Sequence, residues 1–417
     1  NSAIDVSVHD TVRGSSKLLA SNTTAAEATS GQYITAFNNN GFSLGTGNPN
    51  TNALNFASYT FRKAAKFFDV VTWTGDGASS KQIAHNLGGT IGAVIVKRTD
   101  TTSDWPTWVR NSLGNYSSFT SGGRGLNSSS AALNTNESGY NSAFTSSTLN
   151  VGTGGNVGIG ALGDCNTSGG SYVAYLFADD SSASSIIRCG SFTTDASGNA
   201  TVTDPNWEPQ SLMVKAASAS GDWVMLDAVR GWSLSAEDRS ALVNSTAAES
   251  TATDYGNPTA TGFVFKGAAS TTYIYLAIRR PNKPPTTGTQ IFAATAGLNQ
   301  VIVSGLNTSN GSPNPQDLYV MFGDRTTPTT PAWLWADRSR GYASAGSPIL
   351  DSTSTAAQSA RTTSPYIYHA DATGYTNFVP STNSMVYRFA RAAGVFDIVS
   401  YKGNGGSSQS IAHNLGG

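Results

Sequence analysis

Residues 68–89 read FDVVTWTGDGASSKQIAHNLGG, and residues 396–417 read FDIVSYKGNGGSSQSIAHNLGG. The two stretches are identical at 14 of 22 positions, without a gap, at an offset of 328 residues. Such fixed-period self-similarity is typical of tandem modules. Each copy begins with an alternating run of β-branched and aromatic residues and continues into a Gly-x-Gly turn, which predicts a strand followed by a reversal. The chain is therefore expected to consist of repeated β-rich units.

Weaker copies divide this interval into three steps. A Ser/Thr-rich stretch with an Ala-Ala pair recurs at Ala25, Ala131, Ala247 and Ala356. A Tyr-rich strand is aligned at Tyr59, Tyr172, Tyr273 and Tyr387, the first copy reading SYTFRKAA. We predict a period of about 109 residues, with a partial first repeat at 1–66, complete repeats at 67–182, 183–288 and 289–394, and the start of a fifth at 395–417.

The fold class follows from the length and spacing of the predicted strands. Short strands at regular spacing with Gly and Asn turns are typical of a β-sandwich. A propeller blade would need about 40–50 residues, so the longer period fits whole domains better. One short helix is predicted at 235–243, where Ser235 is followed three residues later by Asp238 in a capping pattern. The sequence therefore predicts an all-β protein made of tandem β-sandwich-like repeat domains.

Composition excludes several classes of protein. Charged residues make up 12% of the chain and the net charge is −1, too little positive charge to neutralise a phosphate backbone, so we expect no nucleic-acid partner. No apolar run reaches the roughly 18 residues that a membrane span needs, so we expect no membrane insertion. The chain starts inside a repeat and lacks an initiator Met, and we expect it to be a segment of a longer polypeptide.

Histidine and cysteine positions give no sign of a metal or cofactor site. No H-x-x-x-H or C-x-x-C spacing occurs, and we predict no metal and no cofactor. His85 and His413 lie in the repeated IAHNLGG motif, where a ligand or base role is one interpretation. The alternative is a turn in which Ile83 and Leu87 point inward and His85 or Asn86 bonds turn backbone.

The two cysteines, Cys165 and Cys189, have no counterparts in the other repeats. They are interpreted either as two buried thiols or as a cross-strand disulfide. The sequence alone cannot decide between them, because a disulfide requires a particular Cα separation.

An Asp-x-x-Arg-Gly element recurs and predicts paired turns. The i,i+3 spacing brings the carboxylate and guanidinium together, so each pair is expected to fix the shape of a turn, with a ligand clamp as the alternative. The predicted pairs are Asp10 with Arg13, Asp227 with Arg230, and Asp337 with Arg340. The second repeat is aligned here with Thr107 and Arg110, keeping only the arginine.

Tryptophans are the candidate binding residues. Aromatic side chains stack on sugars and concentrate at interface hot spots, although a Trp repeated at one position also suits a core. The candidates cluster around one repeated strand and turn and are Trp105, Trp108, Trp223, Trp232, Trp333 and Trp335. No catalytic residues are predicted, because no nucleophile elbow or phosphate loop occurs and no carboxylate pair recurs.

The order of elements within one unit points to a family. A unit runs from an F-D-V-V-T-x-T-G-x-G strand through an I-x-H-N-L-G turn, a V-I-V-K strand, a D-W strand and a D-x-V-R-G turn to an S-T-A-A-E stretch, a G-F-S-L-G turn and a Y-V-A-Y strand. This order resembles an uncharacterised tandem repeat domain of tail-fibre and virion-associated proteins of marine and cyanobacterial phages. The resemblance covers nearly the whole chain and carries over no catalytic residues.

The resemblance implies a placement rather than a chemistry. It predicts a non-enzymatic structural and host-attachment component of a virion, as a tail fibre, tailspike shaft or capsid appendage, located extracellularly on the particle. Expected partners are other virion proteins, a host surface glycan or protein, and further copies of the chain in a homo-oligomer such as a trimer. The alternatives are a bacterial cell-surface adhesin or glycan-binding repeat protein, and a polysaccharide depolymerase.

Overall fold

The computed structural model is almost entirely β, with 45% of residues in strands and 2% in helices, which confirms the predicted class. It describes residues 4–39, 41–51, 56–120, 125–153, 164–182, 184–228, 230–232 and 238–280 continuously. Beyond residue 280 it describes shorter segments, which include 292–296, 318–322, 333–337, 348–352, 367–370, 375–377, 385–392 and 395–399.

Three six-stranded antiparallel sheets share one topology, and each lies within one predicted repeat. In each sheet the first strand pairs with the last strand of the repeat, and the other four follow in chain order. The second repeat has β6 (Phe68–Thr74), β13 (Ser171–Ala178), β8 (Ile91–Arg98), β9 (Thr107–Arg110), β10 (Tyr116–Phe119) and β11 (Asn134–Glu137). The third has β14 (Ile187–Thr193), β22 (Thr272–Arg279), β16 (Pro209–Ala216), β17 (Val224–Asp227), β18 (Asp238–Leu242) and β19 (Ser250–Thr253).

The fourth repeat keeps the same strand order. Its sheet runs β23 (Phe292–Ala296), β30 (Met385–Phe389), β24 (Leu318–Phe322), β25 (Trp333–Asp337), β26 (Pro348–Asp351) and β27 (Ser359–Ala360). The identical order in three segments with little sequence identity shows that the repeat is a folding unit as well as a sequence pattern.

Smaller sheets form the second layer of each unit. The second repeat pairs β7 (Lys81–Ala84) with β12 (Thr148–Val151), and the third pairs β15 (Asn199–Val202), β21 (Gly262–Lys266) and β20 (Gly256–Thr259). The fourth pairs β28 (Ile367–Ala370) with β29 (Tyr375–Asn377). In the third repeat Phe263 and Phe265 of the small sheet pack in one core with Leu212 and Tyr275 of the large one. This face-to-face packing is the predicted sandwich-like arrangement.

The first repeat contains only part of the strands seen in the complete repeats. Strands β1 (Ser7–Asp10), β2 (Gly14–Ala20) and β3 (Ala28–Thr29) form one sheet, and β4 (Ile34–Asn38) pairs with β5 (Gly41–Leu44). The Tyr-rich strand predicted around Tyr59 is wrong, because residues 56–63 form no strand. Strands β13 and β22 each have a partner on both sides. The described residues of the first repeat include no strands equivalent to these partners, so the segment around Tyr59 has no neighbouring strand with which to pair.

The predicted short helix at 235–243 is also wrong where the structure describes it. Residues 238–242 form β18, which pairs with β17 on one side and β19 on the other. Residues 233–237 lie outside the described part of the chain. Burial of Asp238 and Ser240 on alternate positions shows that the sheet, rather than the local capping pattern, decides this segment.

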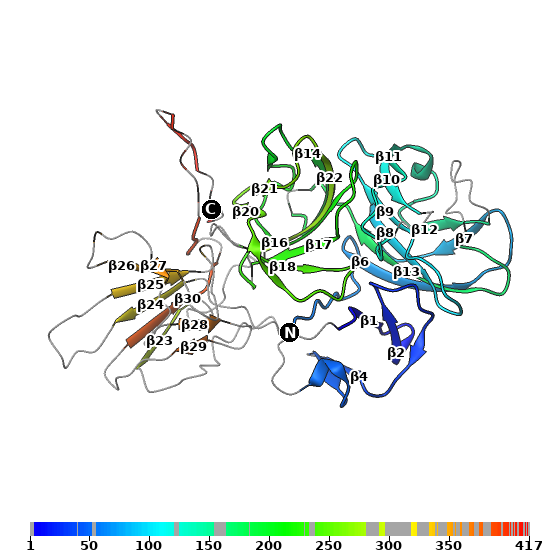
Figure 1. The fold of residues 1–417 in the computed structure, drawn as a ribbon, viewed down its shortest axis with the longest axis horizontal. Coiled ribbons are helices and arrows are strands. Elements are labelled where there is room, and N and C mark those ends of the chain that lie inside the picture. The colour runs from blue at the N-terminus through cyan, green and yellow to red at the C-terminus, as the bar shows by residue number, and fades with distance from the viewer. Residues whose placement is uncertain are drawn as a thin grey trace.

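The first three repeats pack against one another (Figure 1), and the fourth is drawn to their left. One core cluster runs from Leu19 in the first repeat, through the second, to Met213, Trp223 and Leu276 in the third. Because this core crosses repeat boundaries, the first three repeats form one packed body. No helix in the described residues is long and apolar enough to cross a membrane.

Candidate functional site

Several buried polar side chains lie where one repeat meets the next. The loop that carries the Ala-Ala pair of the first repeat docks on the second: Lys97 Nζ donates to the carbonyl oxygen of Thr24 at 3.0 Å, and Trp105 Nε1 donates to the carbonyl oxygen of Thr23 at 2.9 Å. Backbone bonds add to this contact, with the Glu27 amide donating to Thr99 at 2.8 Å. We call this set of contacts the loop joint.

The second and third repeats are connected by the same loop joint. Lys215 Nζ donates to the carbonyl oxygens of Ser129 at 3.1 Å and Ser130 at 2.7 Å, and Trp223 Nε1 donates to Gly125 at 3.0 Å. The Ala132 amide donates to Ala217 at 2.9 Å, as Glu27 does to Thr99. Lys97 and Lys215 are therefore equivalent, and so are Trp105 and Trp223.

An asparagine holds each loop to its own repeat. Asn22, Asn127 and Asn244 donate from Nδ2 to Asp5, Asp104 and Asp222, at 2.8, 2.9 and 2.8 Å. In the second and third repeats the same asparagine accepts from the amide of the joint tryptophan, at 3.0 and 2.9 Å. Each loop is thus anchored to its own repeat by hydrogen bonds that are separate from its contacts with the next repeat.

Burial lowers the pKa of Lys97 and of Lys215 to about 8, from an ordinary value of 10.5, even though Asp104 and Asp222 act in the opposite direction. In the unfolded chain both lysines hold their protons to higher pH, so unfolding takes up protons between these values and the free energy of unfolding rises with pH there. We expect the stability advantage of the wild-type chain over a Lys97→Met, Lys215→Met variant to grow from about pH 8 to about pH 10. Urea titrations across this range measure it, and a constant difference would contradict the assignment.

A second type of contact joins repeats at the Asp-x-x-Arg turns. Within each turn Arg13, Arg230 and Arg340 donate from Nε to the aspartate three residues earlier, at 2.6, 2.5 and 2.5 Å. This confirms the predicted turn pairs Asp10–Arg13, Asp227–Arg230 and Asp337–Arg340. The same aspartates also accept the backbone amide of the arginine, at 2.8, 2.8 and 3.0 Å, so each carboxylate fixes the turn twice.

A tyrosine from another repeat completes two of these turns. Tyr175 of the second repeat donates to Asp10 Oδ2 at 2.9 Å and accepts from Arg13 Nη2 at 3.1 Å. Tyr59 of the first repeat donates to Asp227 Oδ2 at 2.6 Å and accepts from Arg230 Nη2. Tyr175 is buried, whereas Tyr59 is 37% exposed over the whole residue and only its hydroxyl end is enclosed. Desolvation of the hydroxyl, reinforced by the neighbouring aspartate, raises the pKa of both phenols, which keeps each hydroxyl a donor. We call this arrangement the tyrosine latch.

The second repeat has no Asp-x-x-Arg turn. Counted from the joint tryptophans, Val109 stands where the third repeat has Asp227, and Ser112 stands where it has Arg230. The prediction that Arg110 is the retained arginine of the motif is therefore wrong. The sequence alignment is off by two residues because it matches the arginines themselves, whereas the strand register pairs Ala93 with Val109 and Ser211 with Asp227.

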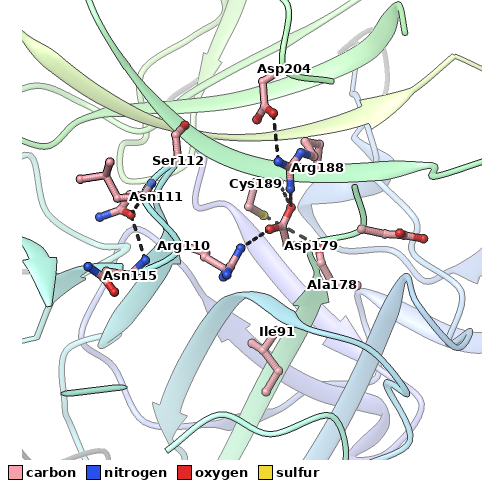
Figure 2. A network of polar contacts seen from close by, with 12 residues as sticks. Ile91, Arg110, Asn111, Ser112, Asn115, Ala178, Asp179, Arg188, Cys189 and Asp204 are labelled. Carbon is pink, nitrogen blue, oxygen red and sulfur yellow. Dashed lines mark hydrogen bonds and ion pairs between the residues drawn. The ribbon is translucent and has the colours of Figure 1, made fainter. Parts of the chain in front are cut away.

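Arg110 instead belongs to a buried ionic network between the second and third repeats (Figure 2). One carboxylate oxygen of Asp179 forms an ion pair with Arg110 Nη1 at 2.8 Å, and the other forms an ion pair with Arg188 Nη1. Its side chain is only 2% exposed. Arg188 continues to Asp204 at 2.9 Å, which also accepts from the Tyr275 hydroxyl at 2.7 Å. Asp179 therefore bridges two arginines from neighbouring repeats, and Asp204 supplies the second carboxylate of the network.

Both cysteines are free and buried, which confirms the thiol interpretation over the disulfide. Burial raises the pKa of each thiol, with Asp164 beside Cys165 and Asp179 beside Cys189 adding to the effect. Since the thiolate is the reactive form, neither thiol should react with Ellman's reagent in the folded chain, and both should react in guanidinium. Rapid labelling of the folded chain would contradict this placement.

Four of the six candidate tryptophans are not surface residues. Trp105, Trp108, Trp223 and Trp232 are 1, 0, 0 and 0% exposed, so their prediction as surface binding residues is wrong. Two of them form the loop joints, and Phe119 packs edge-on against Trp223 at 5.0 Å between ring centroids. Trp335 is 38% exposed. The side chain of Trp333 lies outside the described part of the structure.

His85 forms a turn, as its structural interpretation predicted. Its Nδ1 accepts the Leu87 amide at 3.2 Å, and His413 accepts the Leu415 amide at the same distance. Ile83 and Leu87 are buried. Burial lowers the pKa of His85 despite the opposing charge of Asp69. Among the described residues, no group of three or more His, Cys, Asp or Glu side chains is placed to hold a metal ion.

An open groove of about 530 Å³ lies beside the latch between the first and second repeats. Its lining includes Arg13 and Glu27 from the first repeat and Thr72, Thr74 and Ser171 from the second. Hydroxyls and a carboxylate of this kind suit a hydroxyl-rich ligand. Trp73 also borders the groove but is only 8% exposed, because it stacks on Tyr172, so it offers little face for a sugar ring.

A family model described as a domain of unknown function (DUF7483) matches residues 1–281. The chain belongs to this family. No curated protein and no solved structure matches the chain. The DUF7483 match ends just after β22, the last strand of the third repeat. It therefore spans the three repeats that share one core.

Sequence reasoning missed the groups that join the repeats of this DUF7483 domain. Lys97 and Lys215 were visible as the last residues of the matched strand motifs AVIVK and LMVK, and the asparagines of the loops precede the Ala-Ala pairs. These signals mark recurrence but do not identify the bonding partners. The loop partners of the lysines lie in the preceding repeat, and those of the asparagines lie about 17 to 23 residues away in the same repeat. Tyr175 was missed because Tyr172, three residues earlier, was taken as the repeated tyrosine.

Proposed function

We propose that the chain is a structural, non-enzymatic part of a phage virion, as a tail fibre, tailspike shaft or capsid appendage that takes part in host attachment. The observation that carries the proposal is the use of buried polar side chains at the joints between repeats. Lys97, Lys215 and Asp179 all bond across a repeat boundary or fix the groups that do. The chemistry that recurs from repeat to repeat therefore connects units.

Rigid joints suit an appendage that must hold its tip in place. Neighbouring domains of one chain usually move relative to each other unless their interface is large and apolar. Here an apolar core and charged groups together cross the boundaries between the first three repeats. The resemblance in motif order to repeats of phage tail-fibre proteins supports the same proposal, and the virion is then the proposed extracellular location.

The proposed partners are other virion proteins, further copies of the chain in a homo-oligomer such as a trimer, and a glycan or protein of the host surface. Among the aromatic candidates, the exposed Trp335 of β25 is the residue we assign to host contact. A solvent-exposed indole can stack on a sugar ring, and several weak sites on one appendage would gain avidity.

Immunogold electron microscopy of purified phage particles tests this proposal, with antibody raised against the chain. We expect gold on tail or head appendages, and a particle lacking the gene product as the control should stay unlabelled. Gold on bacterial envelopes with bare virions would overturn the virion role and favour the cell-surface adhesin. Depolymerase activity on host polysaccharide, measured as release of reducing ends, would overturn the non-enzymatic assignment.

A further inference from the structure

The tyrosine latches define which repeats belong together. Tyr175 of the second repeat closes on the turn of the first, and Tyr59 of the first closes on the turn of the third. The third repeat joins the second through Trp223, Lys215 and the ionic network of Asp179. Ser21 Oγ also donates to the Val243 carbonyl at 2.7 Å, a second bond between the first and third repeats. The three repeats thus contact one another in a closed circuit.

The two halves of the latch are lost together. Strand pairing places Tyr175 opposite Ile95 and Leu276 opposite Met213, and these partners stand two residues before Lys97 and Lys215. Leu276 of the third repeat therefore occupies the position of the latch tyrosine. A tyrosine at this position of the third repeat would contact the turn of the second repeat. In that turn Val109 and Ser112 replace the aspartate and the arginine. A repeat without the turn is followed by a repeat without the tyrosine, as expected if the two act as one device.

The fourth repeat lacks the lysine of the loop joint. Pairing places Ser211 opposite Asp227 and Leu318 opposite Asp337, so Phe322 stands where Lys215 stands in the third repeat. Its described contact with the third repeat is of another kind: Arg391 Nη1 meets Glu208 Oε2 at 2.7 Å. Trp333 pairs with Phe322 and stands at the position of the joint tryptophans, so the fourth repeat keeps the tryptophan of the joint and lacks only its lysine. It therefore cannot make the lysine bonds to the preceding loop that the second and third repeats make.

The long period of the sequence agrees with a module of three repeats. The gapless match at an offset of 328 residues aligns residues 68–89, at the start of the second repeat, with residues 396–417, which follow the fourth repeat. The pair Lys63–Asp69, at 2.8 Å, recurs as Arg391–Asp397 at that offset. The latch tyrosine Tyr59 likewise recurs as Tyr387.

We propose that the structural module of this protein is a closed ring of three repeats, latched by Tyr59 on the Asp227–Arg230 turn, and that the fourth repeat opens a second module. The rival is an open array, in which the tyrosine of each repeat closes the turn of the repeat before it. In that array Tyr387, not Tyr59, would close Asp227–Arg230. The proposal does not depend on the virion role.

Hydrogen exchange on the full 417-residue chain separates the two arrangements. The probes are the amides of Arg230, bonded to Asp227 Oδ1, and Trp232, bonded to the Asp227 carbonyl oxygen. Tyr59→Phe keeps the ring and removes the hydroxyl, and should speed exchange of both amides by about tenfold, the usual effect of a lost bond to a charged group. Tyr387→Phe should leave both rates unchanged.

Tyr175→Phe provides the matched control. It should speed exchange of the Arg13 amide, which bonds Asp10, and leave Arg230 unchanged. The ring is supported only if Tyr59→Phe, and not Tyr387→Phe, exposes the Asp227 turn. Faster exchange with Tyr387→Phe, or no change with Tyr59→Phe, overturns it.

Discussion

Replacing Asp179 by alanine should lower the free energy of unfolding by about 3–5 kcal/mol, the usual cost of removing one partner of a buried ion pair. Asp179 bridges Arg110 and Arg188, with its own side chain 2% exposed (Figure 2). Without it, the Arg110 guanidinium loses the carboxylate it pairs with and Arg188 keeps only Asp204. Urea unfolding of the full chain measures the loss.

Asp100→Ala is the control for this substitution. Asp100 pairs with Arg98 at 2.9 Å, but both side chains are partly exposed, at 35 and 26%. Exposed pairs contribute about 0–1 kcal/mol because water and salt screen them. Equal losses for Asp179→Ala and Asp100→Ala would show that the network at the repeat boundary has no special role in stability.

Trp223→Ala should cost about 3–5 kcal/mol as well, through the cavity it leaves in a packed core. The side chain is fully buried, packs against Phe119 and donates to the Gly125 carbonyl oxygen, so its loss weakens the second loop joint directly. Thermal or urea unfolding followed by circular dichroism measures the change.

The matched control is Trp335→Ala, which removes the same side chain from an exposed position. Trp335 is 38% exposed, so its removal should cost clearly less than that of the fully buried Trp223, because less of its apolar surface is buried. If Trp223→Ala were as mild as Trp335→Ala, the tryptophans would not be joint residues, and their interpretation as binding residues would regain support.

The sequence was sufficient for features that depend on local spacing. The i,i+3 distance in Asp10–Arg13 predicted an ion pair, and the pair is present in each of the three described turns. The turn at His85 followed from the Gly-Gly ending and the short spacing to Leu87. The all-β class followed from the alternation of apolar residues within short strands.

Contacts between repeats were not predictable in the same way. Tyr172 and Tyr175 lie an odd number of residues apart in β13 and therefore face opposite sides of the sheet. Sequence similarity chose Tyr172, whereas the latch uses Tyr175. Lys97 has the sequence pattern of the polar end of a strand, yet it is buried between Ser103 of its own repeat and the docked loop of the first repeat. The side chains that join repeats are decided by packing at long range, which a single sequence does not encode locally.

The shared core implies that the first three repeats unfold as one body rather than as three independent domains. Native-state hydrogen exchange at increasing denaturant tests it most directly, because it reports the opening free energy of each segment. We expect the slowest amides of β2, β8 and β16, one strand from each repeat, to share one opening free energy and one denaturant dependence. Three separate opening free energies, each with a smaller denaturant dependence, would contradict it.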